Sequence, residues 1–254
     1  MVKQLLGEIE LNRIYQRDCL EGMRMIPDDT IDMILCDLPY GTTRNKWDTV
    51  IPFEPLWEQY ARVIKDNGAI VLFSHGLFSA KLQLSKEKWW RYDLEWEKDR
   101  PTGFLNAKKM PLRSHEDIQV FYKKLPVYNP QMSVGKPLHS KGSSYLIKPA
   151  VNNNYGKFEV TDDSRKGNTE KYPRSILKFK RPHPPIHPTQ KPVELFEYLI
   201  KTYTNEGDIV LDNCMGSGTT AIAAVRSNRN FIGFELEREY VEIANQRLDN
   251  EKGR

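Results

Sequence analysis

The sequence predicts an α/β domain with a mostly parallel sheet of seven strands, and three observations support this. Short apolar runs of strand length recur along the chain, and segments with apolar residues at three- and four-residue spacing separate them. Strands that alternate with helices favour a parallel sheet that is covered on both faces. The 254 residues suffice for one large domain, or for a compact domain with an insertion.

The predicted elements follow from these patterns in chain order. The strands are 12–17, 31–36, 69–73, 92–96, 118–122, 209–211 and 231–234, and the helices are 55–64, 77–87, 193–203, 219–227 and 237–248. The segment between roughly 123 and 185 breaks the alternation, because it is rich in Asn, Ser, Gly, Pro and Lys. A structureless loop of this length is unusual inside a compact domain, so we predict an inserted module.

Charge is distributed unevenly along the chain. Residues 123–191 hold 14 Lys and Arg against 4 Asp and Glu, a formal charge of +10, so the rest of the chain carries −6 within a total of +4. A basic middle segment with interspersed aromatic residues favours a polyanion as partner, and a solvated polar loop is the alternative.

The cysteines and the apolar runs bear on location and on metal binding. Cys19, Cys36 and Cys214 are isolated and lack CxxC spacing, which argues against disulfides and a structural zinc site. No run approaches the roughly 18 apolar residues of a membrane span, and the first residues lack a signal-peptide core. We therefore expect a cytoplasmic protein with no metal and no membrane partner.

The segment 208–220, DIVLDNCMGSGTT, joins an apolar strand to a helix through a glycine loop. The strand ends at Asp212, Gly216 and Gly218 follow, and the helix begins at Thr219. In doubly wound sheets a ligand binds at the carboxyl ends of the strands, where glycines let the backbone approach it closely. The next predicted strand ends in Glu235, whose carboxylate is placed to bind two ribose hydroxyls.

This glycine loop has competing interpretations. A phosphate-binding P-loop is excluded, because Thr219 rather than lysine follows Gly218. A dinucleotide-binding fold stays open, since Gly216, Gly218 and Ala221 fit its fingerprint, although only 36 residues follow Gly218. A plain tight turn is the third interpretation. A cofactor strand this late in the chain suggests a circularly permuted order.

The tetrapeptide Asp37-Leu38-Pro39-Tyr40 directly follows the predicted strand 31–36. A carboxylate, a carbonyl in a turn stiffened by proline and an aromatic ring thus leave the strand together. This set suits a planar ligand that presents an amino group, with the ring as a stacking surface. A turn with a packed tyrosine is the structural alternative.

Together these motifs resemble those of the amino DNA methyltransferases that use S-adenosylmethionine, specifically their permuted β class. In that class an Asp-Pro-Pro-Tyr element comes first, the target-recognition region follows and the cofactor loop comes last, and this chain keeps that order over nearly its full length. Three further segments match: Arg17-Asp18-Cys19-Leu20, His115-Glu116-Asp117 and His187-Pro-Thr-Gln-Lys-Pro192.

The resemblance implies a seven-stranded, circularly permuted Rossmann-like methyltransferase sheet. Residues 1–123 would form the catalytic half, 124–186 the target-recognition insert and 187–254 the cofactor-binding half. The implied catalytic residues are Asp37, Pro39 and Tyr40. The implied contacts of S-adenosylmethionine are Asp18, Cys19, Asp37, His187, Thr189, Gln190, Lys191, Asp212, Cys214, Gly216, Ser217, Gly218, Thr219, Thr220 and Glu235.

The same resemblance implies the reaction and its partners. An Asp at the head of the tetrapeptide indicates transfer to N6 of an adenine flipped out of double-stranded DNA, and cytosine N4 is the alternative. The insert would read the DNA sequence, and Lys108, Lys109 and Arg113 are further candidate contacts, with a solvated loop as the alternative. A homodimer is expected, because dimerisation is common in this class.

The chain departs from the family pattern at two places. Leu38 replaces the first proline, which affects the rigidity of the turn more than its hydrogen bonding. Asn213-Cys214 replaces a common Pro-Phe, which removes an expected aromatic contact to the cofactor.

Other function classes remain as alternatives to this assignment. They are a methyltransferase acting on RNA or on protein glutamine, a catalytically silent DNA-binding homologue and a nicotinamide oxidoreductase. The motif order and the basic insert argue against the first, the presence of Asp37, Tyr40, Asp212 and Glu235 against the second, and the unexplained tetrapeptide against the third.

Overall fold

The computed structural model describes residues 4–43, 45, 48–137, 151–152, 156–157, 167–184 and 190–253. The chain divides into two compact units, Met1–Asn129 with Ser175–Arg254 and Pro130–Arg174. In the smaller unit β8 (Ser133–Val134) pairs with β11 (Glu170–Lys171), and β9 (Val151–Asn152) pairs with β10 (Gly156–Lys157). The larger unit holds the central sheet and the candidate site.

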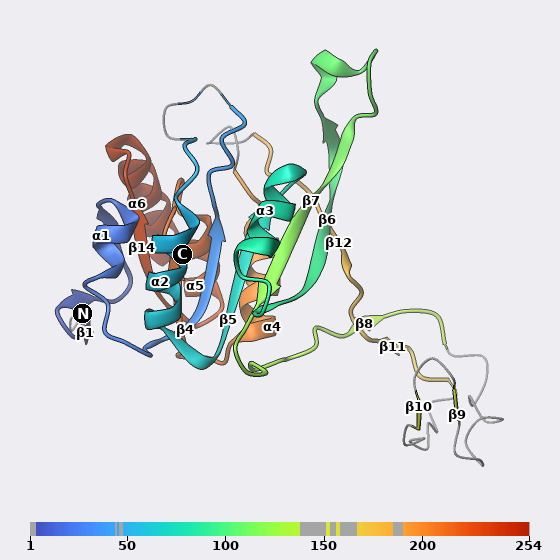
Figure 1. Cartoon of the computed structure of the whole chain (residues 1–254), viewed down its shortest axis with the longest axis horizontal. Coiled ribbons are helices and arrows are strands. Elements are labelled where there is room, and N and C mark those ends of the chain that lie inside the picture. The colour runs from blue at the N-terminus through green and yellow to red at the C-terminus, as the bar shows by residue number, and fades with distance from the viewer. Residues whose placement is uncertain are drawn as a thin grey trace. The chain divides into compact units, whose positions relative to one another are not determined.

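An eight-stranded sheet forms the centre of the larger unit (Figure 1). Its spatial order is β12-β6-β7-β5-β4-β13-β14-β3. The strands are β3 (Arg13–Gln16), β4 (Ile31–Asp37), β5 (Ile64–Ser74), β6 (Trp90–Thr102), β7 (Arg113–Phe121), β12 (Ile176–Phe179), β13 (Ile209–Asp212) and β14 (Asn230–Glu235). All neighbours are parallel except β7, which is antiparallel to both β5 and β6. A separate hairpin joins β1 (Leu5–Leu6) to β2 (Ile9–Glu10).

The predicted α/β class with a mostly parallel sheet is confirmed, and all seven predicted strands are present. The sheet has an eighth strand, β12, which pairs with β6 and arises in the segment predicted as an insert. Its four residues read Ile-Leu-Lys-Phe, and only Leu177 among them is fully buried. So short and mixed a run carries too little apolar signal to be distinguished from its polar surroundings.

Helices cover both faces of the sheet (Figure 1). They are α1 (Cys19–Met23), α2 (Phe53–Val63) and α3 (Leu77–Ser85) on one face, and α4 (Val193–Tyr203), α5 (Thr219–Arg226) and α6 (Arg238–Lys252) on the other. The buried side chains of β4 alternate between the two resulting cores, Met33 and Leu35 in one, Ile34 and Cys36 in the other. The sequence predicted every helix except α1, whose five residues are too few to show a periodicity.

The direction of the strands places their functional ends together. Because β4, β5, β13 and β14 run in parallel, their carboxyl ends meet at one edge of the sheet. The β6–β7 hairpin, which carries the short 3-10 helix η1 (Phe104–Asn106), extends past this edge (Figure 1). Among the helices of the described ranges, none combines the length and apolar composition that a membrane span needs.

The contact of α1 with the sheet predicts a sharp difference between two glycines. A Cβ at Gly22 would lie 2.4 Å from the buried ring of Phe234, whereas a Cβ at Gly233 would meet the flexible end of Met215. We expect Gly22→Ala to lower the free energy of unfolding by about 1–3 kcal/mol, because the ring has no free space to move into. Gly233→Ala should lower the free energy of unfolding by a smaller amount. Urea unfolding of both variants tests this, and equal costs would contradict it.

Candidate active site

A cavity of about 700 Å³ opens at the carboxyl edge of the sheet. The larger unit supplies all the residues that line it, and these include most of the predicted site. The predicted residues on its wall are Asp18, Cys19, Asp37, Pro39, Tyr40, Gln190, Lys191, Asp212, Cys214, Gly216, Ser217, Thr219, Thr220 and Glu235. Gly218 belongs to the same loop, and His187 and Thr189 lie outside the described residues.

The glycine loop between β13 and α5 forms one side of the cavity. Gly216 and Gly218 have φ angles of +52° and +83°, a conformation that disfavours side chains. A Cβ at Gly218 would also lie 2.9 Å from Ala244 of α6, so glycine permits the close packing of α5 and α6. The positive φ angles of the loop therefore explain why glycine occupies positions 216 and 218.

Glu235, at the end of β14, is tied to this loop. Its Oε2 accepts a hydrogen bond from the Gly216 N–H at 2.7 Å, and its Oε1 accepts one from the Glu237 N–H at 2.9 Å. Burial raises the pKa of the Glu235 carboxyl above its ordinary value, and the backbone donors oppose that shift. The carboxylate is thus held beside the loop, where the sequence predicted a ribose contact.

Asp212 is buried below the same loop. Its Oδ2 accepts a hydrogen bond from the Thr220 hydroxyl, and its Oδ1 accepts one from the Cys214 N–H at 3.0 Å. Burial raises the pKa of this carboxyl to about 7, against the opposing effect of both donors. These contacts show that Asp212 and Thr220 join the strand end to the first turn of α5.

The tetrapeptide leaves the end of β4, beside β13, and also lines the cavity. The Tyr40 hydroxyl donates to Oδ1 of Asp37 at 2.5 Å, and the Tyr40 ring packs edge-on against His75 with centroids 5.0 Å apart. Leu38, which stands where the family pattern has proline, is buried in the core. Asp48 fixes the following turn by accepting hydrogen bonds from the N–H groups of residues 41–43.

Lys191 contacts the Asp37 carboxylate rather than the glycine loop. Its Nζ lies 2.6 Å from Oδ2 of Asp37 and 3.0 Å from Oε2 of Glu116. The other oxygen of Glu116, Oε1, lies 2.6 Å from Nζ of Lys98. The sequence predicted Lys191 as a contact of the cofactor. It placed Glu116 in a segment that matches the family but gave it no role, and it did not single out Lys98.

His75 is a third site residue that the sequence did not predict. It directly follows β5 and lines the cavity, and its Nδ1 is buried with no hydrogen-bond partner in the described part of the chain. Burial, together with the charge of Arg113, lowers the pKa of the imidazole. The ring is therefore neutral at physiological pH.

The three cysteines meet beside the cavity as free thiols. Hydrogen bonding to Cys214 and burial raise the pKa of Cys19, and burial raises the pKa of Cys36 to about 12. Thiols that stay protonated are poor nucleophiles, so covalent catalysis by cysteine does not fit this site. Within the described ranges, no three His, Cys, Asp or Glu side chains are arranged to hold a metal ion.

The two sides of the cavity suit two different ligands. A glycine loop with a fixed carboxylate, Glu235, can bind the hydroxyls of a nucleoside, and the absence of a Cβ allows close approach. The carboxylate of Asp37 and the ring of Tyr40 can hold a planar group that carries an amine. The site can therefore bring a nucleoside cofactor and an amine acceptor together.

Comparison with known proteins agrees with this geometry. DNA adenine methyltransferase YhdJ of Escherichia coli (strain K12) is 28% identical over 94% of this chain and 83% of the relative. A solved structure of an M1.HpyAVI–SAM complex is 27% identical, covers 93% of this chain and 99% of that chain, and gives a TM-score of 0.63. The cytosine-N4-specific PvuII DNA methyltransferase has a TM-score of 0.63 over 95% of this chain and 91% of that chain. At 16% identity, this last likeness shows the fold alone.

The comparison with family models covers most of the chain. The N6_N4_Mtase model, described as DNA methylase, matches residues 31–246, from the first residue of β4 into α6. This range contains the tetrapeptide, Lys191, the glycine loop and Glu235. The protein belongs to this family of DNA methylases.

Proposed function

We propose that this DNA methylase transfers the methyl group of S-adenosylmethionine to the exocyclic N6 of adenine in DNA. The observation that carries the proposal is the presence of Asp37, at the end of β4, and Glu235, at the end of β14, on the wall of one cavity. Aspartate at the head of the tetrapeptide and the adenine methyltransferase among the relatives support adenine. Cytosine N4 is the second candidate, because it presents the same kind of exocyclic amine.

The residues of the glycine-loop side fit S-adenosylmethionine. Gly216 and Gly218 leave room for close approach, and Glu235 is held by backbone N–H groups beside them. Asp18, which caps α1, and Cys19, its first residue, reach the same cavity. The cofactor supplies a methyl group made reactive by a positively charged sulfur. The relative whose structure is a SAM complex supports this choice.

The residues of the tetrapeptide would bind and orient the base. A base inside a duplex must flip out before its amine can enter a cavity, at a cost of a few kcal/mol. Stacking on Tyr40 would recover roughly 1–3 kcal/mol of this. The Asp37 carboxylate and the Pro39 carbonyl would accept the two amine hydrogens, which directs the nitrogen lone pair out of the ring plane. Asp37 also stabilises the positive charge that develops on nitrogen, and positioning supplies most of the remaining catalysis.

The β6–β7 hairpin has the composition of a DNA contact beside the cavity. Residues 100–113 contain Arg100, Lys108, Lys109 and Arg113 and no acidic residue. At the tip, Phe104 and Leu105 are 78% and 83% exposed, and Thr102 and Arg113 reach the cavity itself. Cations bind phosphates without regard to sequence, so this hairpin would hold the duplex near the site.

Three further features belong to this proposal. The chain would be of the permuted β class, with halves 1–123 and 187–254 around a target-recognition insert, 124–186, that reads the sequence. Its basic composition supports this role, and residues 138–150, 153–155, 158–166 and 185–186 of the insert lie outside the described residues. The protein would act in the cytoplasm and form a homodimer.

The first prediction concerns the product. We expect the protein to transfer label from S-adenosylmethionine to duplex DNA, and digestion with mass measurement to identify N6-methyladenine. Labelled N4-methylcytosine would replace the adenine proposal with the second candidate. An absence of label in DNA of mixed sequence would contradict the proposed function.

A second prediction concerns Asp37. The variant Asp37→Ala removes one acceptor of the amine hydrogens, so kcat should fall by about a hundredfold or more, while the Kd for S-adenosylmethionine changes little. Asp66→Ala is the matched control. Asp66 lies near the amino end of β5, at the edge of the sheet away from the cavity, so this variant should keep full activity. Loss of cofactor binding with retained transfer in Asp37→Ala would contradict the assigned role.

A third prediction concerns the hairpin. Reversing two charges in Lys108→Glu/Lys109→Glu should weaken DNA binding and flatten its dependence on salt, because fewer counterions are released. The matched double reversal Lys81→Glu/Lys88→Glu, on exposed residues of α3 and the turn that follows it, should leave both unchanged. Fluorescence anisotropy at several salt concentrations measures both quantities. Equal losses in the two variants would show that only net charge matters.

A further inference from the structure

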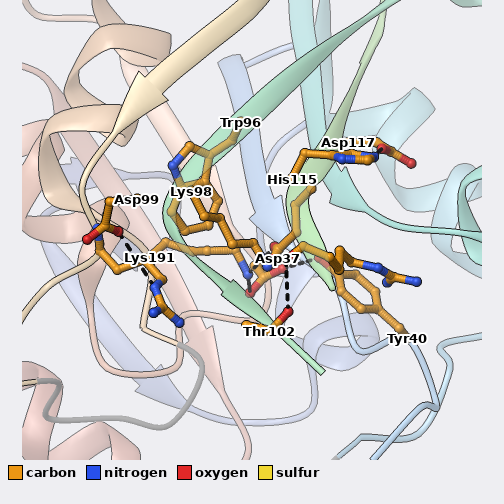
Figure 2. A network of polar contacts seen from close by, with 12 residues as sticks. Asp37, Tyr40, Trp96, Lys98, Asp99, Thr102, His115, Asp117 and Lys191 are labelled. Atoms are coloured by element: carbon orange, nitrogen blue, oxygen red, sulfur yellow. Dashed lines mark hydrogen bonds and ion pairs between the residues drawn. The ribbon is translucent and has the colours of Figure 1, made fainter. Parts of the chain in front are cut away.

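A buried row of alternating charges extends from the interior of the sheet to the catalytic carboxylate (Figure 2). It contains Lys98 of β6, Glu116 of β7, Lys191 before α4 and Asp37 at the end of β4. The three ion-pair distances are 2.6, 3.0 and 2.6 Å, in the order from Lys98 to Asp37. The side chains of Lys98 and Lys191 are only 4% and 7% exposed.

The surroundings of this row keep its two middle groups, Lys191 and Glu116, ionised. Burial alone would lower the pKa of Lys191, yet the charges of Asp37 and Glu116 outweigh it and raise that pKa. Burial alone would raise the pKa of Glu116, yet Lys191 and Lys98 hold it at about 2. Two positive and two negative charges balance, which is the condition under which buried charges are tolerated.

Lys191 is held independently of Asp37. Glu116 binds its ammonium from one side, and the ring of Phe73 on β5 has its centroid 5.3 Å from Nζ. Glu116 is fixed in turn by Lys98, whose own ammonium lies 5.7 Å from the centroid of Trp96. The ammonium of Lys191 therefore occupies one position, set by three neighbouring strands.

The consequence for Asp37 is that its two oxygens are not equivalent. Oδ2 faces the fixed ammonium of Lys191, whereas Oδ1 accepts a hydrogen bond from the Tyr40 hydroxyl. A tyrosine hydroxyl can turn to another partner when a base stacks on its ring, but loss of Lys191 would leave two partly buried carboxylates without their shared cation. Oδ1 is thus the oxygen that an incoming amine can reach.

We infer that Lys191 is a positioning residue of the transfer step, which holds Oδ2 of Asp37 so that Oδ1 faces the amine. Glu116 and Lys98 act through Lys191, and none of the three contacts the reacting atoms. This inference rests on the proposed function, because it assigns Lys191 to the acceptor side of the cavity. The sequence had predicted Lys191 on the cofactor side, and the two roles have different kinetic consequences.

The variant Lys191→Met separates the two roles, since it keeps the apolar stem and removes the charge. A positioning residue should lower kcat by about 10- to 100-fold, with the Kd for S-adenosylmethionine changed less than about threefold. Isothermal titration gives that Kd, and steady-state methylation of duplex DNA gives kcat and KM. Lys201→Met, on an exposed turn of α4, is the matched control and should behave as the wild type.

A second variant protects the test against misfolding of the first. Glu116→Gln keeps Lys191 and Asp37 and removes the anchor between Lys191 and Lys98, so it should also lower kcat with the cofactor Kd unchanged. In the double variant, the Glu116→Gln change should lower kcat little beyond the effect of Lys191→Met, because Glu116 acts through the ammonium of Lys191. Thermal unfolding of each variant reports its folding.

Three outcomes overturn the inference. The first is a cofactor Kd at least about tenfold higher in Lys191→Met with kcat unchanged, which makes Lys191 a cofactor ligand. The second is an unchanged kcat in both single variants when both are folded. The third is a double variant in which the losses of kcat from the two changes add fully. Each of these leaves the proposed function intact. Failure of the wild type to methylate DNA would instead remove the proposed function and this inference together.

Discussion

The pairing of β4 with β13 is the constraint on which the site depends. The two strands are parallel, with Met33 opposite Val210 and Ile34 opposite Leu211, so both deliver their terminal carboxylates to one edge. Asp212 is buried there and shapes the glycine loop, while Asp37 reaches the cavity. Two strands far apart in the sequence thus bring the tetrapeptide and the glycine loop to one cavity. The remaining strands and helices bury the flanks of this pair.

Most of the fold was predictable because its signals are local. The strands β4 and β5 contain uninterrupted apolar runs, and α4 has apolar residues on one face, so pattern alone locates them. Two other features of the fold were not predicted from the sequence, each for a physical reason. The pairing of β12 with β6 depends on tertiary contact rather than on its own four residues. The outer part of the β6–β7 hairpin is polar, so its strands continue beyond the apolar segments that revealed them.

The site was predictable where its residues are neighbours in sequence, as in the tetrapeptide and the glycine loop. Lys98 and Glu116 were not, because their role exists only once β6 lies beside β7. One signal could have found them: Lys98 comes two residues after the buried Trp96, and Glu116 two before the buried Ile118. Alternation along a strand places each charge on an inward face, where it needs a partner of opposite sign. The contact of Lys191 with Asp37 was not predictable from motif position, since the two residues lie 154 positions apart in the sequence.

That separation has a consequence for how the protein is made. During synthesis the N-terminal segment emerges first, with β4 and β5 able to pair, while β13 and Lys191 are still to be translated. Until they arrive, the edge of β4 is uncovered and Asp37 has no cation beside it. The nascent chain therefore has no assembled site, and its central strand depends on contacts of high sequence separation, which form slowly. The cavity can be completed only after the segment from Lys191 to Glu235 has left the ribosome.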